Sequence, residues 1–275
     1  MATSLPRIAI VGAGSMGGAI LSGLLDPSVT VSGGIRVTNR TEAKAAVVRS
    51  EGVESFALEN TPDGNARAVK GAKVVMLGVK PAMIPDTLTD LKPFLEPDAI
   101  VISVAAGVTT ARMEAIVDNV VLRAMPNTPA IVGKAVIGLS AGSRATDDDL
   151  AIGRAVFETV GTVVETPESQ IDALSTISGS GPAYVFYFIE EFTRTAIDMG
   201  FTPEQALTLV AGTFDGSLAL LAASESSPEQ LRKQVTSPKG TTERAVEQFQ
   251  AADLKSIFDK ATGAALARAK ELAAG

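Results

Sequence analysis

A glycine pattern close to the N-terminus restricts the folds open to this chain more than any other segment. Gly12, Gly14 and Gly17 form a Gly-x-Gly-x-x-Gly motif directly after an apolar run and at the start of a helical stretch. The first glycine permits a tight turn, the second lets the backbone approach a pyrophosphate, and the third lets the helix pack close to the strand. Amides at the helix start then face the phosphate charge. The motif predicts a dinucleotide site formed by Val11, Gly12, Ala13, Gly14, Ser15, Met16 and Gly17; the alternative is a glycine-rich turn without a ligand.

The first part of the chain alternates β-branched runs with helical stretches. Continuous apolar runs such as residues 74–77 suit strands that are covered on both faces. The alternation predicts an α/β fold with a doubly wound, mostly parallel sheet. The predicted strands are Arg7–Val11, Ile35–Thr38, Val53–Phe56, Lys73–Val79, Ala99–Val104, Val120–Ala124, Ala135–Ser140 and Thr162–Glu165.

After about residue 167 the sequence predicts helices alone. Thr202-Pro203-Glu204-Gln205 and Ser227-Pro228-Glu229-Gln230 each offer an N-cap, a proline at the first helical position and a glutamine at the third. Thr166-Pro167 begins in the same way. The apolar segment from Pro182 to Met199 predicts a helix that ends at Gly200 and is buried on most sides, which a small lone domain cannot achieve. We therefore expect domains at residues 1–167 and 168–275, with a dimer core in the second.

The end of the second predicted strand indicates which dinucleotide is bound. An NAD enzyme carries an acidic residue there, about 20 residues after the glycine motif, to bind the ribose 2′-hydroxyl. This chain instead has Asn39, Arg40 and Thr41. The guanidinium fork of Arg40 suits a 2′-phosphate, so NADPH is expected, with NADH as a weaker alternative. The alternative for Arg40 is a solvated residue at a helix start.

Other predicted strands end in small or polar residues, at the edge where open α/β sheets bind ligands. Val79, Lys80 and Pro81 follow one strand, Val104, Ala106 and Gly107 lie at the end of another, and Asn127 lies beyond a third. The small residues leave room for a nicotinamide ring. Three ordinary turns are the alternative.

A segment rich in hydroxyl groups, Thr236-Ser237-Pro238-Lys239-Gly240-Thr241-Thr242, lies at the start of a predicted helix. One N-cap needs one hydroxyl, but several crowd this turn. Gly240 lets backbone amides converge, and such a nest at a helix start binds a small carboxylate. A simple N-cap is the alternative.

Composition excludes several functions. The 275 residues include no cysteine and no histidine, so thiolate catalysis, disulfides, cysteine-bound metals and a Ser-His-Asp triad are ruled out. No metal site is expected. The net charge of −7 disfavours nucleic acid. We find no signal-like start and no apolar run near 18 residues, and we expect a cytoplasmic protein without a membrane partner.

The motifs GAGSMG, NRT, GVKP, VAAG, MPNTP, SGSGPAY and TSPKGTT, in this order, closely resemble the pyrroline-5-carboxylate reductase family along nearly the whole chain. The resemblance implies a Rossmann-like N-terminal domain and an all-α C-terminal dimerisation domain, with homodimers that often assemble into homodecamers. It implies NADPH-dependent reduction of 1-pyrroline-5-carboxylate to L-proline, by hydride transfer to the imine carbon.

The resemblance also implies residue roles. Ser237, Gly240, Thr241 and Thr242 hold the substrate carboxylate and ring nitrogen, and Glu168 contacts substrate. Asn60, Val79, Lys80, Val104 and Ala106 touch NADPH. Thr242 is the expected catalytic residue, through positioning, because the pKa of a hydroxyl is too far from neutral for acid catalysis. Lys239 stands where the family usually has glycine.

Two other functions share features with this sequence. A β-hydroxyacid dehydrogenase has the same two-domain outline but usually carries a lysine on the first helix of the second domain, and residues 182–199 contain none. A non-catalytic NADP-binding regulatory protein is disfavoured by the small residues at the expected ring site and the intact hydroxyl-rich segment.

Overall fold

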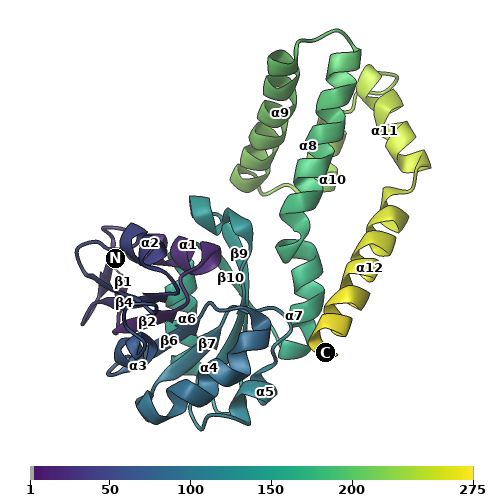
Figure 1. Cartoon of the computed structure of the whole chain (residues 1–275). Helices are drawn as coiled ribbons and strands as arrows, with labels where there is room; N and C mark the ends of the chain where they lie inside the picture. Colours follow the sequence, from purple (N-terminus) through teal and green to yellow (C-terminus); the bar gives the residue numbers. More distant parts are fainter. Residues whose placement is uncertain (1–2, 275) are drawn as a thin grey trace. The chain divides into compact units, whose positions relative to one another are not determined.

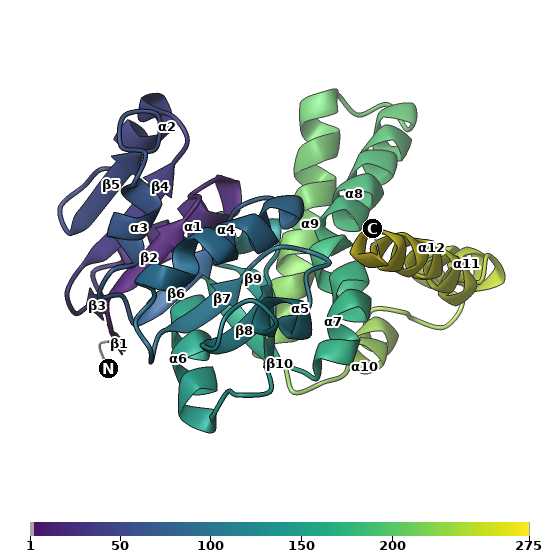
Figure 2. The ribbon, with the colours of Figure 1, turned by 60° about the horizontal axis from the view of Figure 1, so that its bottom comes forward.

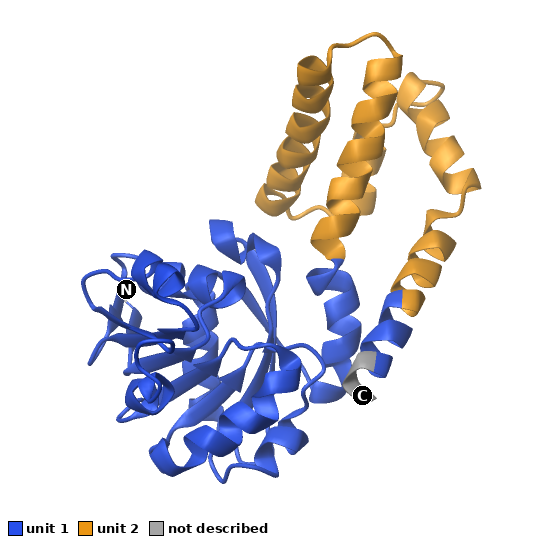
Figure 3. Cartoon of the chain, in the orientation of Figure 1, with its two compact units in different colours: residues 1–180, 265–275 blue, residues 181–264 orange. Residues whose placement is uncertain are grey.

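The structure, a computed structural model, describes residues 3–274, and its contacts divide the chain into two compact units. Unit 1 contains residues 1–180 and 265–275, and unit 2 contains residues 181–264 (Figure 3). The predicted domain boundary between residues 167 and 168 follows the end of the last strand, at Glu165, and stays a prediction.

Unit 1 is built on an eight-stranded sheet with the order β10-β9-β8-β7-β6-β2-β4-β5 (Figure 1). Its strands are β2 (Ile8–Val11), β4 (Ile35–Asn39), β5 (Val53–Ala57), β6 (Val74–Leu77), β7 (Ile100–Ser103), β8 (Val120–Met125), β9 (Ala135–Ala141) and β10 (Gly161–Glu165). Each corresponds to a predicted strand. Adjacent strands pair in parallel except β8 and β9, which are antiparallel, so the predicted mostly parallel, doubly wound sheet is confirmed.

Two short strands were missed. β1 (Thr3–Leu5) and β3 (Val29–Val31) pair in parallel as a separate two-stranded sheet. Three residues are too few for alternating polarity to stand out in a sequence.

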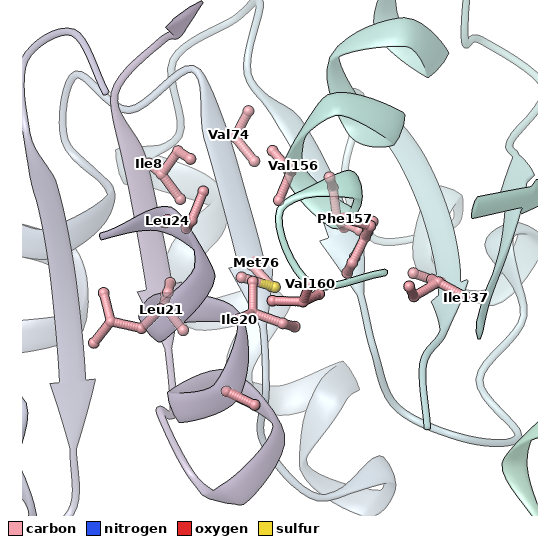
Figure 4. Packing of buried hydrophobic residues seen from close by; sticks show 14 of the residues in the cluster. Ile8, Ile20, Leu21, Leu24, Val74, Met76, Ile137, Val156, Phe157 and Val160 are labelled. Carbon is pink, nitrogen blue, oxygen red and sulfur yellow. The ribbon is translucent and has the colours of Figure 1, made fainter. Parts of the chain in front are cut away.

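Helices cover both faces of the large sheet (Figure 2). Alternation along each strand sends successive side chains to opposite faces. Ile8 and Met76 pack on one face with α1 (Ser15–Leu24) and α6 (Asp147–Glu158), as Figure 4 shows. Val11 and Leu77 pack on the other with α3 (Gly64–Val69), α4 (Ile84–Leu91) and α5 (Thr110–Glu114). Unit 1 also contains α2 (Glu42–Val47), α7 (Glu168–Leu174) and single helical turns at Pro81–Met83, Lys92–Phe94, Thr128–Val132 and Ser175–Gly179.

The order of the strands reverses between β2 and β6. The chain moves outward through β4 and β5 on one side of β2 and through β6 and β7 on the other. Loops at the carboxyl ends of β2 and β6 therefore separate and open a crevice, which is where open α/β sheets bind ligands.

Unit 2 is helical. It comprises α8 (Gly181–Asp198), α9 (Pro203–Ala223), α10 (Pro228–Gln234), α11 (Thr241–Ala251) and the part of α12 (Leu254–Ala274) up to Ala264. The predicted starts of α9 and α10 are confirmed, because Thr202 and Ser227 each form a capping box with the glutamine three residues later. The predicted end of α8 is confirmed by Gly200, whose φ is +100°. At α7 the capping position is Pro167 rather than Thr166.

Large apolar side chains of unit 2 are exposed in the single chain. Phe186, Tyr187 and Phe192 on α8 are exposed, and Ala196 is the one described α8 residue that is buried. The expectation that α8 is buried on most sides is thus not met within one chain. Among the described residues, α9 is long and apolar enough, by length and composition alone, to cross a membrane, although we expected no such segment.

Candidate active site

A first cleft of about 470 Å³ opens at the carboxyl ends of β2, β4 and β6. It contains three cationic side chains, Arg40, Lys44 and Lys80, and no carboxylate among its described lining residues. Such a lining favours phosphate groups. The lining residues are Val11, Gly12, Gly14, Thr38, Asn39, Arg40, Thr41, Lys44, Leu58, Asn65, Gly78, Val79, Lys80, Met83 and Thr87.

The glycine turn forms one wall of the first cleft. Gly12 has a φ of +86°, and a Cβ atom there would lie 2.8 Å from Cγ1 of Val79. A Cβ at Gly78 would lie 2.5 Å from the carbonyl oxygen of Gly12, so the two backbones nearly touch. A Cβ at Gly14 would meet no atom within 4 Å. Since the protein itself does not require glycine at position 14, close approach of a ligand is the remaining physical reason.

Helix α1 begins beside this wall without a side-chain cap. Gly14 is its N-cap residue and offers no hydroxyl or carboxylate to the first-turn amides. Those amides and the helix dipole are therefore available to an anion. Ser15, Met16 and Gly17 lie in this first turn.

The tip of β4 carries the residues expected to bind the 2′-phosphate. Asn39, Arg40 and Thr41 all line the cleft, and 4% of the surface of Asn39 is exposed. Nδ2 of Asn39 is buried, and no atom of the described residues accepts its hydrogen bond. An orphaned buried donor in a cleft suits an acceptor supplied by a ligand.

Asn60, which was expected to touch NADPH, is not among the described residues that line the first cleft. Its Nδ2 donates to Oε2 of Glu42 at 3.2 Å, and Arg49 pairs with the same carboxylate. The hydrogen bond from Arg49 is the largest cause that lowers the pKa of Glu42, burial opposes it, and Asn60 adds to the lowering. The amide that lines the cleft is that of Asn65, whose Oδ1 is buried and lacks a partner among the described residues. The sequence reasoning missed Asn65.

A second cleft of about 460 Å³ lies in the same unit and shares Lys80 with the first. Its lining includes Pro81, Ala106 and Gly107, the small residues expected near a nicotinamide ring. The full lining is Lys80, Pro81, Ala82, Ala106, Gly107, Val108, Arg112, Arg123, Met125, Asp172, Ser175 and Ala269. Val104, predicted to touch the cofactor, packs against the core.

Asn127 has structural partners. Its Nδ2 donates to the carbonyl of Ser178 at 3.0 Å, and its Oδ1 accepts from the amide of Val136 at 2.9 Å. The side chain is 7% exposed and joins β9 to the turn after α7. The structure therefore uses Asn127 to hold the loop after β8.

Glu168 is held by two partners in unit 1. Its Oε1 accepts from the amide of Thr110 and its Oε2 from the Thr110 hydroxyl, both at 2.6 Å. Arg123 Nη1 lies 3.5 Å from Oε1. Sequence reasoning missed Arg123, although a charged residue inside the apolar run of β8 was a visible signal.

The hydroxyl-rich segment lies in unit 2 and runs into the first turn of α11, which begins at Thr241. Gly240 is the N-cap residue and no side chain caps the helix, so the simple N-cap interpretation of Ser237, Thr241 and Thr242 is wrong. The hydroxyl of Thr236 donates to the carbonyl of Arg232 at 2.6 Å. Within residues 3–274, no hydrogen bond engages the hydroxyls of Ser237, Thr241 and Thr242, which leaves them open to a ligand.

The glycine turn, the reversal of strand order and the acid-free cleft together define a dinucleotide-binding oxidoreductase with an added helical domain. Two family models match the chain: "NADP oxidoreductase coenzyme F420-dependent" over residues 7–107, and "Pyrroline-5-carboxylate reductase dimerisation" over residues 168–272.

Full-length relatives give the family. A pyrroline-5-carboxylate reductase of Pseudomonas aeruginosa is 36% identical, covering 98% of each chain, and one of Corynebacterium melassecola is 34% identical, covering 98% of this chain and 99% of the relative. A solved pyrroline-5-carboxylate reductase from Coxiella burnetii is 36% identical with a TM-score of 0.88, covering 96% of this chain and 97% of the other. The chain belongs to the pyrroline-5-carboxylate reductase family.

Proposed function

We propose that this chain reduces 1-pyrroline-5-carboxylate to L-proline with NADPH, the last step of proline biosynthesis. One observation carries the proposal: 98% of the chain aligns with a pyrroline-5-carboxylate reductase at 36% identity. The β-hydroxyacid dehydrogenase and the non-catalytic regulatory protein are not favoured by this similarity.

The residues of the first cleft fit NADPH. The glycine turn and the open amides of α1 suit the pyrophosphate, and Arg40 and Thr41 suit the 2′-phosphate. The orphaned amide groups of Asn39 and Asn65 supply a donor and an acceptor for the nucleotide. We include Asn65 in the proposed site. Ala106 and Gly107 in the second cleft leave space for the nicotinamide.

The segment before α11 is proposed to bind the substrate. First-turn amides of α11 hold the carboxylate, together with the hydroxyls of Ser237 and Thr241. Thr242 orients the ring nitrogen. Glu168 is proposed to contact substrate while it keeps its hydrogen bonds to Thr110.

The reaction needs no imidazole. NADPH, when bound, supplies the hydride. An iminium substrate already carries the proton that the product nitrogen keeps, so the chain has to orient the ring, fix the carboxylate and exclude water. Hydroxyls and backbone amides can do this, which agrees with a chain that lacks histidine and cysteine.

Assembly and location belong to the proposal as well. The exposed apolar side chains of α8 and the dimerisation family model support a homodimer formed by residues 168–275, which we propose assembles further into a homodecamer. We propose a cytoplasmic location, as for a biosynthetic enzyme.

The decisive test is NADPH oxidation by purified full-length protein with 1-pyrroline-5-carboxylate, alongside a panel of β-hydroxyacids with NADP⁺. We expect turnover with the imine alone. Thr242→Ala should lower kcat/KM by roughly tenfold to over a hundredfold, equivalent to one oriented hydrogen bond to a charged group at about 1.5–3 kcal/mol, and Thr242→Ser should retain more activity. Thr236→Ala is the matched control, since the Thr236 hydroxyl already binds a carbonyl. Turnover with a hydroxyacid and none with the imine would refute the proposal.

A further inference from the structure

Arg123 is a charged side chain buried inside unit 1. It lies on β8 between the apolar neighbours Leu122 and Ala124, and 2% of its surface is exposed. An unpaired guanidinium at this depth would be strongly destabilising. Arg123 also lines the second cleft, so whatever it contacts lies at the edge of the proposed site.

Two carboxylates on successive turns of α7 compensate this charge. Nη2 of Arg123 donates to Oδ1 of Asp172 at 2.7 Å, and Nη1 lies 3.5 Å from Oε1 of Glu168. The Glu168 and Asp172 side chains are 24% and 30% exposed, so water screens them only partly. Since they lie four residues apart on one helix, they repel each other unless a cation stands between them.

Glu168 connects Arg123 to α5, at the side of the second cleft where the nicotinamide is proposed to bind. Its two oxygens accept from the amide and the hydroxyl of Thr110, the first residue of α5. Thr110 follows the segment 104–108 after one intervening residue, Thr109, and that segment includes the cleft residues Ala106 and Val108. The chain of contacts therefore runs from β8 through α7 to this segment.

We propose that Arg123 is a positioning residue, which fixes Glu168 on Thr110 and thereby holds segment 104–108 as the wall of the second cleft. The effect on turnover rests on the proposed function. The planar guanidinium is required because one group must face two carboxylates at once. Nε of Arg123 is buried without a partner among the described residues, a cost consistent with placement for these two contacts rather than for full hydrogen bonding.

The test compares Arg123→Met, Arg123→Lys and Glu168→Gln in the full-length protein. In Arg123→Met we expect amide hydrogen exchange in the peptide spanning residues 104–112 to accelerate at least tenfold, with exchange around the glycine turn, residues 8–17, unchanged. kcat/KM for the imine should fall at least tenfold in the folded variant. Arg123→Lys should give intermediate values, because an ammonium can satisfy only one carboxylate. Glu168→Gln should loosen the same peptide, and it serves as the readout if Arg123→Met does not fold.

Arg36→Met is the matched control. Arg36 pairs with Glu54 at 3.0 Å and donates to the carbonyls of Arg67 and Lys70, and it contacts neither cleft residue set described above. It should lower the melting temperature and leave exchange in residues 104–112 and the kinetics of folded protein unchanged.

The exchange measurement needs no turnover, so it separates this proposal from the proposed function. Wild-type protein that is inactive on the imine would refute the function and leave the exchange result interpretable. Wild-type exchange in residues 104–112 in both Arg123→Lys and Glu168→Gln, or unchanged kcat/KM in folded Arg123→Met, would overturn the positioning role.

Discussion

Lys239 holds an unusual backbone conformation at the residue scale. Its φ is +61°, in the left-handed region, where a residue with a Cβ atom is disfavoured by roughly 1–2 kcal/mol. Its amide donates to Oε2 of Glu243 at 2.8 Å, which ties the strained residue to the first turn of α11. Strain of this kind persists where surrounding contacts fix the backbone, often next to a functional segment.

The positive φ of Lys239 predicts that the glycine variant is more stable than the alanine variant there, whereas the order is reversed at a lysine within a helix. Lys239→Gly should be about 1 kcal/mol more stable than Lys239→Ala, because alanine keeps the cost of the positive φ and glycine does not. At Lys233, within helix α10, the alanine variant should be the more stable by about 1 kcal/mol. The free energy of unfolding from denaturant titration checks both pairs. Equal stability of the two Lys239 variants would contradict the backbone argument.

We expect one side chain, that of Arg40, to decide cofactor choice. We expect Arg40→Asp to lower the ratio of kcat/KM for NADPH to that for NADH roughly 10- to 100-fold, because a charged partner of the 2′-phosphate, worth about 1.5–3 kcal/mol, is replaced by a like charge. Steady-state kinetics with both cofactors measure the ratio. Lys70→Asp, the same charge change at an exposed position after α3, should leave it unchanged. A ratio that stays constant in Arg40→Asp would exclude Arg40 as the phosphate ligand.

At the scale of secondary-structure elements, helix α1 of unit 1 approaches the connection between α6 and β10 very closely at one glycine. Near the end of α1, a Cβ at Gly23 would lie 2.4 Å from Cγ1 of Val160 and 2.7 Å from the carbonyl oxygen of Thr159. The same helix contains Gly18, where a Cβ would meet no atom within 4 Å. Close packing therefore requires glycine at position 23 of α1, whereas packing within the protein does not require it at position 18.

We expect Gly23→Ala to destabilise unit 1 by about 1–3 kcal/mol, since the backbone of the α6–β10 connection would have to move. Gly18→Ala should be neutral or stabilising by up to about 1 kcal/mol, because alanine is the better helix former and space is free. Thermal unfolding of the two variants compares them directly. Equal effects would show that helix propensity, not packing, governs α1.

What the sequence could predict depends on the range of the interactions involved. The large-sheet strands were predicted because continuous apolar runs such as Val74–Leu77 reflect burial on both faces, and the glycine turn because its requirements are local. Side-chain partners were not predictable in the same way. Asn60 and Asn65 are five positions apart and chemically identical, and only the fold turns Asn65 into the cleft and Asn60 toward Glu42. Arg123 and Asp172 meet from distant parts of the chain.

At the scale of the whole molecule, the exposed apolar side chains of α8 indicate a surface that is completed by another subunit. Phe186 is 66% exposed, although few aromatic residues of this size stay in water in a monomer. We expect the apolar helix α9 to lie in the same subunit interface.

Phe186→Asp should therefore weaken the proposed homodimer at least tenfold, because a buried carboxylate without a partner opposes association. Light scattering over a dilution series measures the dissociation. Val47→Asp is the control. Val47 on α2 is 83% exposed, and single apolar residues on a protein surface are common and need no subunit interface to explain them. An unchanged dimer in Phe186→Asp would remove this part of α8 from the interface.

The near contact between Gly12 and Gly78 has a consequence for recombination between relatives. The end of β6 can adopt its place only if the turn after β2 leaves room for it, and the turn can do so only if position 78 lacks a side chain. The two positions thus constrain each other sterically, although they lie in separate strand–helix repeats. A chimera whose crossover falls between them joins the turn of one parent to the strand end of another. Such a chimera should fold only when the parent that supplies position 12 and the parent that supplies position 78 each carry glycine at that position.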